Sequence, residues 1–322
     1  MRFCLIGCGN IASTMHAPAY RAYQSAHPDF HPVACCDVME SRAVEMQKQV
    51  GFARHYTDYR QMLAKEKPDA VAVIVSETAA VEVGLDVLRA GIPMLIEKPP
   101  GRTSEGTASL AAEAQKRGVP CQVAFNRRYM PVLSAMRARA PEKIHLISYE
   151  LIRYARKDPY FSNTTVHAID AVRYLANADY AHVQFSYWEM PQHGEGVCDI
   201  FMDCTMTSGA KAQIRLCQMA GVSLERAGIY AENHLLLGYT PVWGGVDAPG
   251  RVEDFRDGAA PDILTFEPCE VFRSNGFLQE NEAFFGALAA GKKPVPDIAA
   301  ALNTMLVKEC IDRRQREFHL DA

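Results

Sequence analysis

The chain has 322 residues, of which 48% are hydrophobic, and its formal net charge is −4. This length fits two domains of ordinary size, and the hydrophobic content is enough for a sizeable core in each. The small net charge and the lack of a long basic run argue against a nucleic-acid or membrane-surface binder, and no apolar stretch approaches the roughly 20 residues that span a bilayer.

The N-terminal residues 1–7 lead directly into a strand-like run, so we expect no signal peptide. Ten cysteines are scattered along the chain without a C-x-x-C pair. This pattern predicts neither a disulfide framework nor a zinc site, and we expect no metal. The cysteines are interpreted as small buried hydrophobic residues of a cytoplasmic protein, because ten thiols fit a reducing compartment.

Strands and helices alternate over the first 125 residues. The predicted strands are short and apolar and cover residues 3–7, 33–37, 69–75, 93–97 and 120–125. A helix is expected from about Asn10 with an interruption near Pro18, and the other predicted helices cover residues 41–50, 59–64, 78–90 and 104–117. This alternation predicts a doubly wound parallel α/β sheet.

The pattern changes after about residue 125. Helices are predicted over 130–139, 164–175, 279–290 and 297–314, and strands over 144–154, 183–188, 198–205, 210–217 and 228–237. We expect the later strands to form an antiparallel meander and residues 240–262 to form a long loop. The predicted organisation is therefore a dinucleotide-binding α/β domain over 1–122, followed over 123–322 by an α+β domain with a large, mainly antiparallel sheet for substrate binding and oligomerisation.

A glycine-rich turn follows the first predicted strand. The motif Gly7-x-Gly9-x-x-Ala12 stands between a strand and a helix, which is the context of the Rossmann dinucleotide fingerprint. Gly7 allows the tight turn, Gly9 lets the backbone approach a pyrophosphate, and Ala12 replaces the third glycine in the helix–strand contact. Asn10 and Ile11 complete this predicted phosphate-binding turn, because the helix N-terminus offers free N–H groups.

The second predicted strand ends in Asp37, which we expect to accept hydrogen bonds from the adenosine ribose hydroxyls. Its charge repels a 2′-phosphate, so NAD is favoured over NADP. Arg42 lies close enough in sequence to turn toward a phosphate, which leaves NADP open as well. The structural alternative for Asp37 is an acid that caps the following helix.

The stretch Pro93-Met-Leu-Ile-Glu-Lys-Pro-Pro-Gly101 holds an acid and a base at the end of a buried strand. The prolines lack an N–H group and end the strand, so Glu97 and Lys98 lie at the carboxyl edge of the sheet, where open α/β sheets bind ligands. Ser76 and Asn126 follow two other strands and are added to the predicted cofactor site. The plain alternative is a solvated ion pair at a strand end.

Taken together, these motifs resemble the glucose–fructose oxidoreductase / inositol dehydrogenase / rhizopine-catabolism (Gfo/Idh/MocA) family. The resemblance spans the chain and is strongest over residues 1–130. It rests on motifs in the family's order and spacing, namely Gly7-Cys-Gly-Asn-Ile-Ala12, Asp37, Tyr56-Thr-Asp58-Tyr, Glu97-Lys98-Pro99, Phe125-Asn-Arg-Arg-Tyr129, His167-Ala-Ile-Asp170 and the stretch from Glu282 to Asp297. It implies an NAD(P)-dependent enzyme acting on a sugar or polyol, as a homodimer or homotetramer.

The resemblance also implies that Lys98 lies beside the nicotinamide and the reacting oxygen, and that His167 transfers the proton. Alcohol oxidation releases a proton as well as a hydride, so a base with a pKa near 7 is useful. The sequence departs from the family pattern at Asn163, where sugar and inositol dehydrogenases usually carry an aspartate. Asn163 can orient a hydroxyl but cannot accept a proton. Asp170 is predicted either to replace that acid or to be a packing residue.

Substrate contacts are expected from polar and aromatic residues near the domain boundary and before His167. The predicted substrate residues are Arg127, Arg153, Tyr154 and Tyr160. Two alternatives to a dehydrogenase remain open. One is a redox-neutral enzyme that retains NAD, as in glycoside cleavage through a keto intermediate. The other is a dinucleotide-sensing regulator without turnover, which the replacement at Asn163 keeps open.

Overall fold

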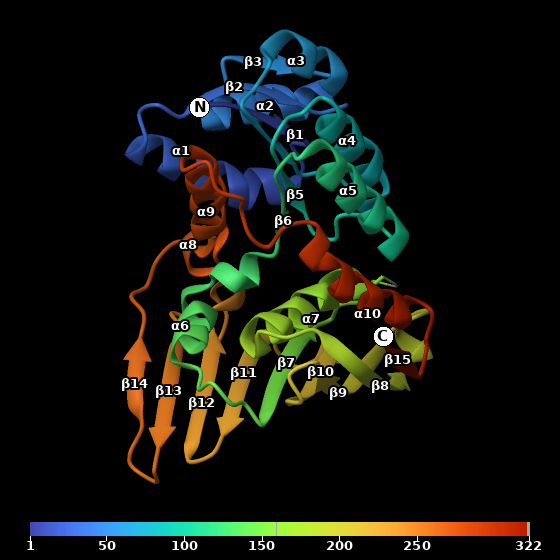
Figure 1. Ribbon diagram of the computed structural model, residues 1–322, viewed down its shortest axis with the longest axis vertical. Coiled ribbons are helices and arrows are strands. Elements are labelled where there is room, and N and C mark those ends of the chain that lie inside the picture. Colours follow the sequence, from blue (N-terminus) through green and yellow to red (C-terminus); the bar gives the residue numbers. More distant parts are fainter. Residues whose placement is uncertain (159, 321–322) are drawn as a thin grey trace. The chain divides into compact units, whose positions relative to one another are not determined.

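The computed structural model describes residues 1–158 and 160–320 of the chain. It divides into two compact units (Figure 1). Unit 1 consists of residues 1–126 and 277–302, and unit 2 of the described residues in 127–276 and from 303 onward. This division corrects the predicted ranges, because the chain returns to unit 1 over residues 277–302. The reason is packing: Phe284 and Phe285 are fully buried in the same core as Phe3.

Unit 1, all of whose residues are described, contains a six-stranded sheet in which every pairing is parallel. The strand order is β3-β2-β1-β4-β5-β6, the arrangement of doubly wound dinucleotide-binding sheets. The strands are β1 (Arg2–Ile6), β2 (His31–Cys36), β3 (Arg54–Tyr56), β4 (Ala70–Val73), β5 (Met94–Glu97) and β6 (Cys121–Ala124). The predicted boundary at residue 122 falls inside β6, so the first domain extends slightly beyond it.

The helices of unit 1 agree with the sequence signals at most of their ends. They are α1 (Ala17–Ala26), α2 (Glu40–Val50), α3 (Tyr59–Glu66), α4 (Glu77–Arg89), α5 (Ser104–Arg117) and α9 (Phe277–Ala289), with the single turn η5 (Ala299–Ala301). Gly51 ends α2 in the left-handed conformation, with a φ of 90°. The Asp58 carboxylate caps α3 by accepting from the backbone N–H groups of Arg60 and Gln61.

The helix after the glycine turn differs from the prediction. The helical assignment runs without a break from Asn10 through Pro18, which lies in the first turn of α1. Instead, a π-helical segment, η1 (Ala12–His16), leads directly into α1. Such π-segments are rare and are often found at functional sites.

The described residues of unit 2 contain a nine-stranded sheet with the order β14-β13-β12-β11-β7-β10-β9-β8-β15. All pairings are antiparallel except that of β7 with β10. The strands are β7 (Leu146–Tyr154), β8 (Tyr180–Glu189), β9 (Cys198–Met206), β10 (Lys211–Ala220), β11 (Leu224–Ala231), β12 (His234–Thr240), β13 (Arg251–Arg256), β14 (Asp262–Thr265) and β15 (Glu317–His319). The parallel fold of unit 1 and the mainly antiparallel sheet of unit 2 confirm the predicted fold class.

Three details of this sheet correct the prediction. The single strand predicted over 228–237 is a hairpin, because Asn233 has a positive φ of 53° and turns the chain between β11 and β12. The predicted loop over 240–262 contains β13, in which Val252 and Asp254 are buried on one face. The predicted meander is broken, since β7 lies between β10 and β11.

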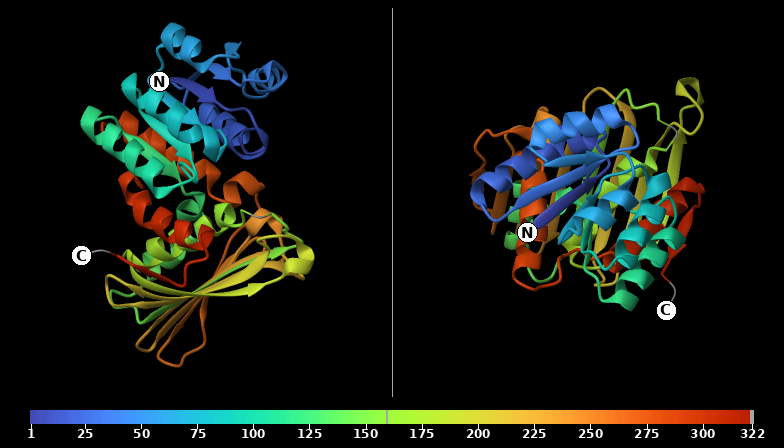
Figure 2. Two further views of the ribbon diagram at one scale, coloured as in Figure 1. Left: turned by 90° about the vertical axis from the view of Figure 1, so that its right-hand side faces the viewer. Right: turned by 90° about the horizontal axis from the view of Figure 1, so that it is seen from above.

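Helices cover one face of this sheet, as the left-hand view of Figure 2 shows. The helical segments of unit 2 are α6 (Pro131–Arg139), α7 (Ser162–Ala176), α8 (Val271–Ser274) and α10 (Leu302–Asp312), with the short turns η2 (Asn126–Tyr129), η3 (Pro191–His193) and η4 (Val242–Gly244). Residues of α6, α7 and α10, such as Met136, Val172 and Ile311, share one buried cluster with the inward side chains of the strands. Burial alternates along these strands, as expected for a sheet with one covered face.

Within residues 1–158 and 160–320, no helix is both long and apolar enough to cross a membrane. All ten cysteines fall in this described part of the chain and none forms a disulfide. Eight are buried, Cys217 is half-buried, and Cys269 is exposed. Burial raises the pKa of several of these thiols, among them Cys36 and Cys198.

Candidate functional site

The predicted cofactor residues of unit 1 come together at the carboxyl edge of its parallel sheet. Gly7 directly follows β1, has a φ of 93°, and donates its backbone N–H to the Cys36 carbonyl at 2.8 Å. A Cβ atom at Gly7 would overlap the backbone carbonyl of Ile74, which follows β4. Gly7 therefore lies between β1 and β4, the point at which the strand order reverses and such sheets bind dinucleotides.

Gly9 differs from Gly7 in its surroundings. A Cβ atom at Gly9 would meet nothing within 4 Å, so no protein atom explains the glycine there. A close approach of the backbone to a ligand does explain it. Asn10 is exposed and Ile11 half-buried beside it, whereas Ala12 is fully buried where the helix packs on the sheet. This arrangement is the one expected for a pyrophosphate-binding turn.

We expect Gly7→Ala and Gly9→Ala to have different effects. Gly7→Ala should lower the free energy of unfolding by about 1–3 kcal/mol, because alanine disfavours a positive φ and its Cβ would displace Ile74. Gly9→Ala should change stability by less than about 0.5 kcal/mol but weaken dinucleotide binding. Urea unfolding and calorimetric titration with NAD measure the two effects. Equal losses of stability in both variants would contradict this distinction.

Asp37 follows β2, and its side chain is 9% exposed. One carboxylate oxygen accepts from the backbone N–H of Cys8 at 2.8 Å, and the other accepts from that of Met39 at 2.9 Å. Met39, not Asp37, is the N-cap residue of α2, so the helix-capping alternative does not describe its position. Each carboxylate oxygen retains a further acceptor lone pair. Asp37 therefore fixes the glycine turn and can still accept hydrogen bonds from a ligand.

The other predicted cofactor residues of unit 1 lie at the ends of its elements. Arg42 is exposed in the first turn of α2. Ser76 is exposed at the N-cap of α4, and its hydroxyl lies 2.8 Å from that of Thr78. Asn126 is buried two residues after the end of β6. The roles of these three residues in cofactor binding stay predictions.

Glu97 ends β5, and both of its carboxylate oxygens are hydrogen-bonded. One lies 3.0 Å from Nε2 of the fully buried His16, and the other accepts the backbone N–H of Lys98 at 2.9 Å. The Nδ1 atom of His16 lies 3.3 Å from the Asn281 side-chain amide of α9. Lys98 is half-buried, and the peptide bond to Pro99 is cis. Glu97 is thus a fixed support for the backbone of Lys98 rather than a solvated ion-pair partner.

In unit 2, the predicted catalytic residues lie on α7. His167 is 8% exposed, and Asn163 is half-buried one helical turn before it. Asp170 is fully buried, and its two carboxylate oxygens accept from the Arg128 guanidinium at 2.7 Å each. Thr304 also donates to Asp170 at 3.5 Å. This geometry favours the packing role of Asp170 over a relay to His167.

Arg127 and Arg153 both pair with one buried acid, Glu225 of β11. The Arg127 guanidinium donates to its two oxygens at 2.7 and 3.1 Å, Arg153 donates as well, and Tyr149 donates at 2.9 Å. Burial alone would raise the pKa of Glu225, but the two guanidinium groups outweigh it and lower that pKa to about 2. Both arginines are buried, with 1% and 3% of their surface exposed. They fit a structural network, and this geometry does not support the predicted substrate contacts.

The two predicted substrate tyrosines are exposed, Tyr154 at 66% and Tyr160 at 58%. Tyr160 also lines a cavity of about 570 Å³ within unit 2. The hydroxyl of Ser162, at the start of α7, is buried there without a hydrogen-bond partner among the described residues. The cavity has the size of a small-molecule site.

Sequence reasoning missed His16 and Glu225. His16 carries no separate signal, because a lone histidine in a predicted helix is usually a packing residue. Glu225 did carry one, since it shares a two-residue alternation with Ala227 and Ile229, which are buried. An acid at such an inward position must be paired, and its partners come from β7 and from the chain after β6.

Comparison with known proteins supports the predicted family resemblance for residues 1–125. Residues 1–125 match the family model GFO_IDH_MocA, described as "Oxidoreductase family, NAD-binding Rossmann fold". Among curated relatives, D-glucoside 3-dehydrogenase of Escherichia coli (strain K12) is 32% identical over 129 residues, which are 40% of this chain and 36% of that protein. Myo-inositol dehydrogenase Hyg17 of Streptomyces leeuwenhoekii is 26% identical over 195 residues, 57% of this chain and 58% of the relative. The matches thus span less than two thirds of these relatives.

Solved structures share the fold over almost the whole chain. A levoglucosan dehydrogenase in complex with NADH and levoglucosan superposes with a TM-score of 0.86 at 16% identity and covers 100% of both chains. A dehydrogenase from Chromobacterium violaceum has the same TM-score at 18% identity and covers 98% of this chain and 95% of the other. The predicted resemblance is confirmed for the first part of the chain: residues 1–125 match the model of the GFO_IDH_MocA oxidoreductase family, which has an NAD-binding Rossmann fold.

Proposed function

We propose that this chain is an NAD(P)-dependent oxidoreductase that transfers a hydride between nicotinamide and a CH–OH group of a sugar, a polyol or a related small molecule. The observation that carries the proposal is the turn at Gly7 and Gly9, held by Asp37 at the reversal point of the parallel sheet. The family match over residues 1–125 and the dehydrogenase names of the curated relatives support it.

The proposed cofactor is NAD, with NADP as the weaker alternative. The N–H groups after Gly7 would bind the pyrophosphate, and the free lone pairs of Asp37 would accept from the ribose hydroxyls. The Asp37 carboxylate repels a 2′-phosphate. Arg42 is exposed near this acid in sequence and would soften the preference without reversing it. When bound, the nicotinamide supplies the hydride acceptor or donor.

The protein's own residues would handle the proton and the charge on oxygen. Lys98 would hold the reacting oxygen by its ammonium group and stabilise negative charge that develops there. His167 would accept the hydroxyl proton, and Asn163 would orient the substrate by hydrogen bonds. Asp170 takes no part in this scheme, because its carboxylate is paired with Arg128.

The substrate would meet the aromatic side chains of Tyr154 and Tyr160, which are exposed. A polyhydroxylated molecule suits tyrosine hydroxyls as hydrogen-bond partners. We further propose a homodimer or homotetramer formed through the sheet of unit 2, and a cytoplasmic location, which fits the ten free thiols. Size-exclusion chromatography with light scattering measures the oligomeric state.

The experiment that tests the proposal is a substrate panel followed at 340 nm. Purified protein is mixed with NAD or NADP and with sugars, inositols and their derivatives. We expect reduction of the dinucleotide with at least one polyol, and a higher kcat/KM with NAD than with NADP. The matched control is the Gly9→Ala variant, which should fold normally and lose activity through weakened cofactor binding.

Two other outcomes identify the alternatives. Protein that retains NAD through purification, converts a glycoside and shows no net change at 340 nm is a redox-neutral enzyme. Protein that binds NAD but turns over nothing on the panel, with Lys98→Ala and His167→Ala binding NAD as the parent does, is a dinucleotide-sensing regulator. Either result would overturn the dehydrogenase proposal.

A further inference from the structure

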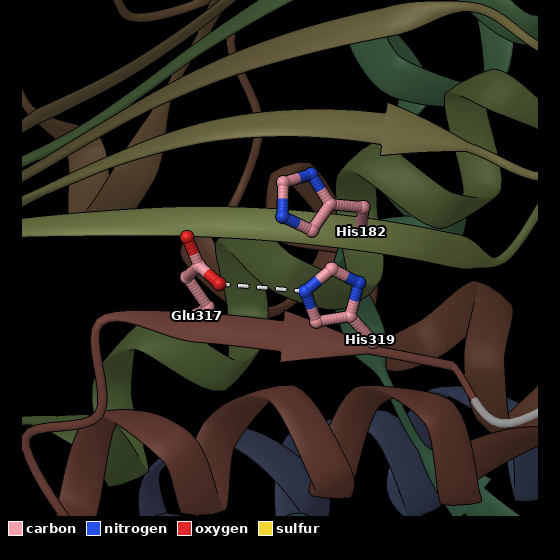
Figure 3. A group of neighbouring side chains, drawn as sticks. All are labelled: His182, Glu317 and His319. Atoms are coloured by element: carbon pink, nitrogen blue, oxygen red, sulfur yellow. Dashed lines mark hydrogen bonds and ion pairs between the residues drawn. The ribbon is translucent and has the colours of Figure 1, made fainter.

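Two histidines and a glutamate gather at one edge of the unit 2 sheet. His182 belongs to β8, and Glu317 and His319 belong to β15, the last strand described (Figure 3). One possible ligand atom from each residue lies within 4.8 Å of those of the other two. None of these residues takes part in the proposed oxidoreductase activity, and sequence reasoning predicts no metal.

The pairing of the two strands brings these side chains together. His319 stands directly opposite His182 in the antiparallel register, and Glu317 precedes His319 by two residues. Side chains at such positions share one face of a sheet. Val183 and Phe318, the neighbours in sequence, are buried on the other face. All three side chains therefore project from the face of the strands opposite the helix-covered core.

The side chains already contact one another. The imidazole rings of His182 and His319 have centroids 4.4 Å apart and an angle of 31° between their planes. Nε2 of His319 lies 3.4 Å from a carboxylate oxygen of Glu317, the contact drawn in Figure 3. Glu317 and His319 are exposed and His182 is half-buried, so small side-chain rotations can adjust the group at little cost.

We propose that His182, Glu317 and His319 bind a divalent first-row transition metal ion such as Zn²⁺. Two imidazole nitrogens and one carboxylate oxygen are ligands that zinc prefers, whereas Mg²⁺ and Ca²⁺ prefer oxygen ligands alone. Around a tetrahedral zinc, ligand atoms stand roughly 3.3 Å apart, so the three atoms need only approach by about 1.5 Å or less. The fourth position remains open to water.

Such an ion would fasten β15 to the sheet. β15 is an edge strand of only three residues, and among residues 1–158 and 160–320 it pairs with β8 alone. Because the metal ligands come from both β8 and β15, a bound ion would link the two strands on the exposed face of the sheet. On that face the core does not pack against the strands. The expected consequence is a metal-dependent stabilisation of the strand over residues 317–319.

The test is calorimetric titration of untagged, chelator-treated protein with Zn²⁺ and, as a control ion, Mg²⁺. The titrations use a Cys269→Ser background, which removes the exposed thiol as a competing zinc ligand. We expect one Zn²⁺ per chain, no binding of Mg²⁺, and slower amide hydrogen exchange around Phe318 when zinc is present.

The variants His182→Ala and His319→Ala should each weaken zinc binding by at least about tenfold. His145→Ala, which removes an exposed histidine of the same unit, is the matched control and should bind zinc as the parent does. Circular dichroism checks that each variant is folded. Unchanged affinity in the double variant His182→Ala/His319→Ala would mean an adventitious ion only. A ratio of one ion to two chains would also overturn the proposal, since all three ligands belong to one chain.

Discussion

Lys98→Ala is expected to lower kcat by about 10²-fold or more with the substrate that the panel identifies. Removing the ammonium group takes away the charge that stabilises negative charge on the reacting oxygen. Lys98 is suited to this role because its backbone is fixed: it follows β5, and its N–H is bonded to Glu97, which His16 holds in turn. Steady-state kinetics at saturating NAD measures kcat, and calorimetry measures the affinity for NAD.

The control for this variant is Lys116→Ala, which removes an exposed lysine from the last turn of α5 in the same unit. It should leave kcat and NAD affinity unchanged. Lys98→Arg tests geometry, because it keeps the charge but replaces a compact ammonium by a larger planar group. An effect of Lys98→Ala on kcat within a few fold would rule out an electrostatic role for Lys98.

The second large effect is expected from Glu225→Ala. This change should lower the free energy of unfolding by roughly 3–5 kcal/mol, because it leaves the buried guanidinium groups of Arg127 and Arg153 without their common partner. This loss of unfolding free energy should exceed the loss caused by an ordinary large-to-small substitution of a core residue on the same sheet. Urea unfolding followed by circular dichroism measures the loss.

Glu150→Gln is the matched control, because Glu150 pairs with Arg215 on the same sheet but both side chains are partly exposed. Screening by water limits such a pair to about 0–1 kcal/mol. If Glu225→Ala and Glu150→Gln lower the free energy of unfolding equally, the buried network does not stabilise unit 2. Glu225→Gln separates charge from shape, since it keeps the size of the side chain and removes only its charge.

The buried network of Glu225, Arg127 and Arg153 also makes the free energy of unfolding depend on pH. The folded-state pKa of Glu225 is lowered from 4.5 to about 2, so the unfolded state binds its proton first as the pH falls. The stability that Glu225 contributes is therefore fully present above about pH 4.5 and declines as the pH falls toward 2. The Glu225→Ala variant should lack this part of the acid dependence.

Much of unit 1 follows from local sequence. A short apolar run bounded by glycine, proline or an acid indicates a buried parallel strand whatever surrounds it, and the caps at Gly51 and Asp58 depend on backbone geometry within a few residues. For the same reason, the placing of Gly7, Asp37 and Lys98 at strand ends could be predicted. The carboxyl ends of parallel strands meet at one edge of a sheet, so strand order alone brings these residues to that edge.

The parts that could not be predicted depend on contacts between distant segments. Residues 277–302 return to unit 1 because Phe284 and Phe285 pack in its core. The two phenylalanines show in the sequence that this helix has a buried face, but they do not show which core buries it. The roles of Arg127 and Arg153 depend on Glu225, which lies on another strand. An arginine near the domain boundary suits a substrate site as well as a structural ion pair. Only the shared partner Glu225 favours the structural role.

The sequence by itself determined the family resemblance, the parallel sheet of unit 1 and the position of its predicted cofactor turn, because each rests on signals confined to a strand and the turn that follows it. Only the tertiary structure decided which charged residues are paired and buried, and which lie together on a surface. The pairing of Arg128 with Asp170 and that of His182 with His319 join residues far apart along the chain. Such pairs form only when packing and strand register bring the two segments side by side.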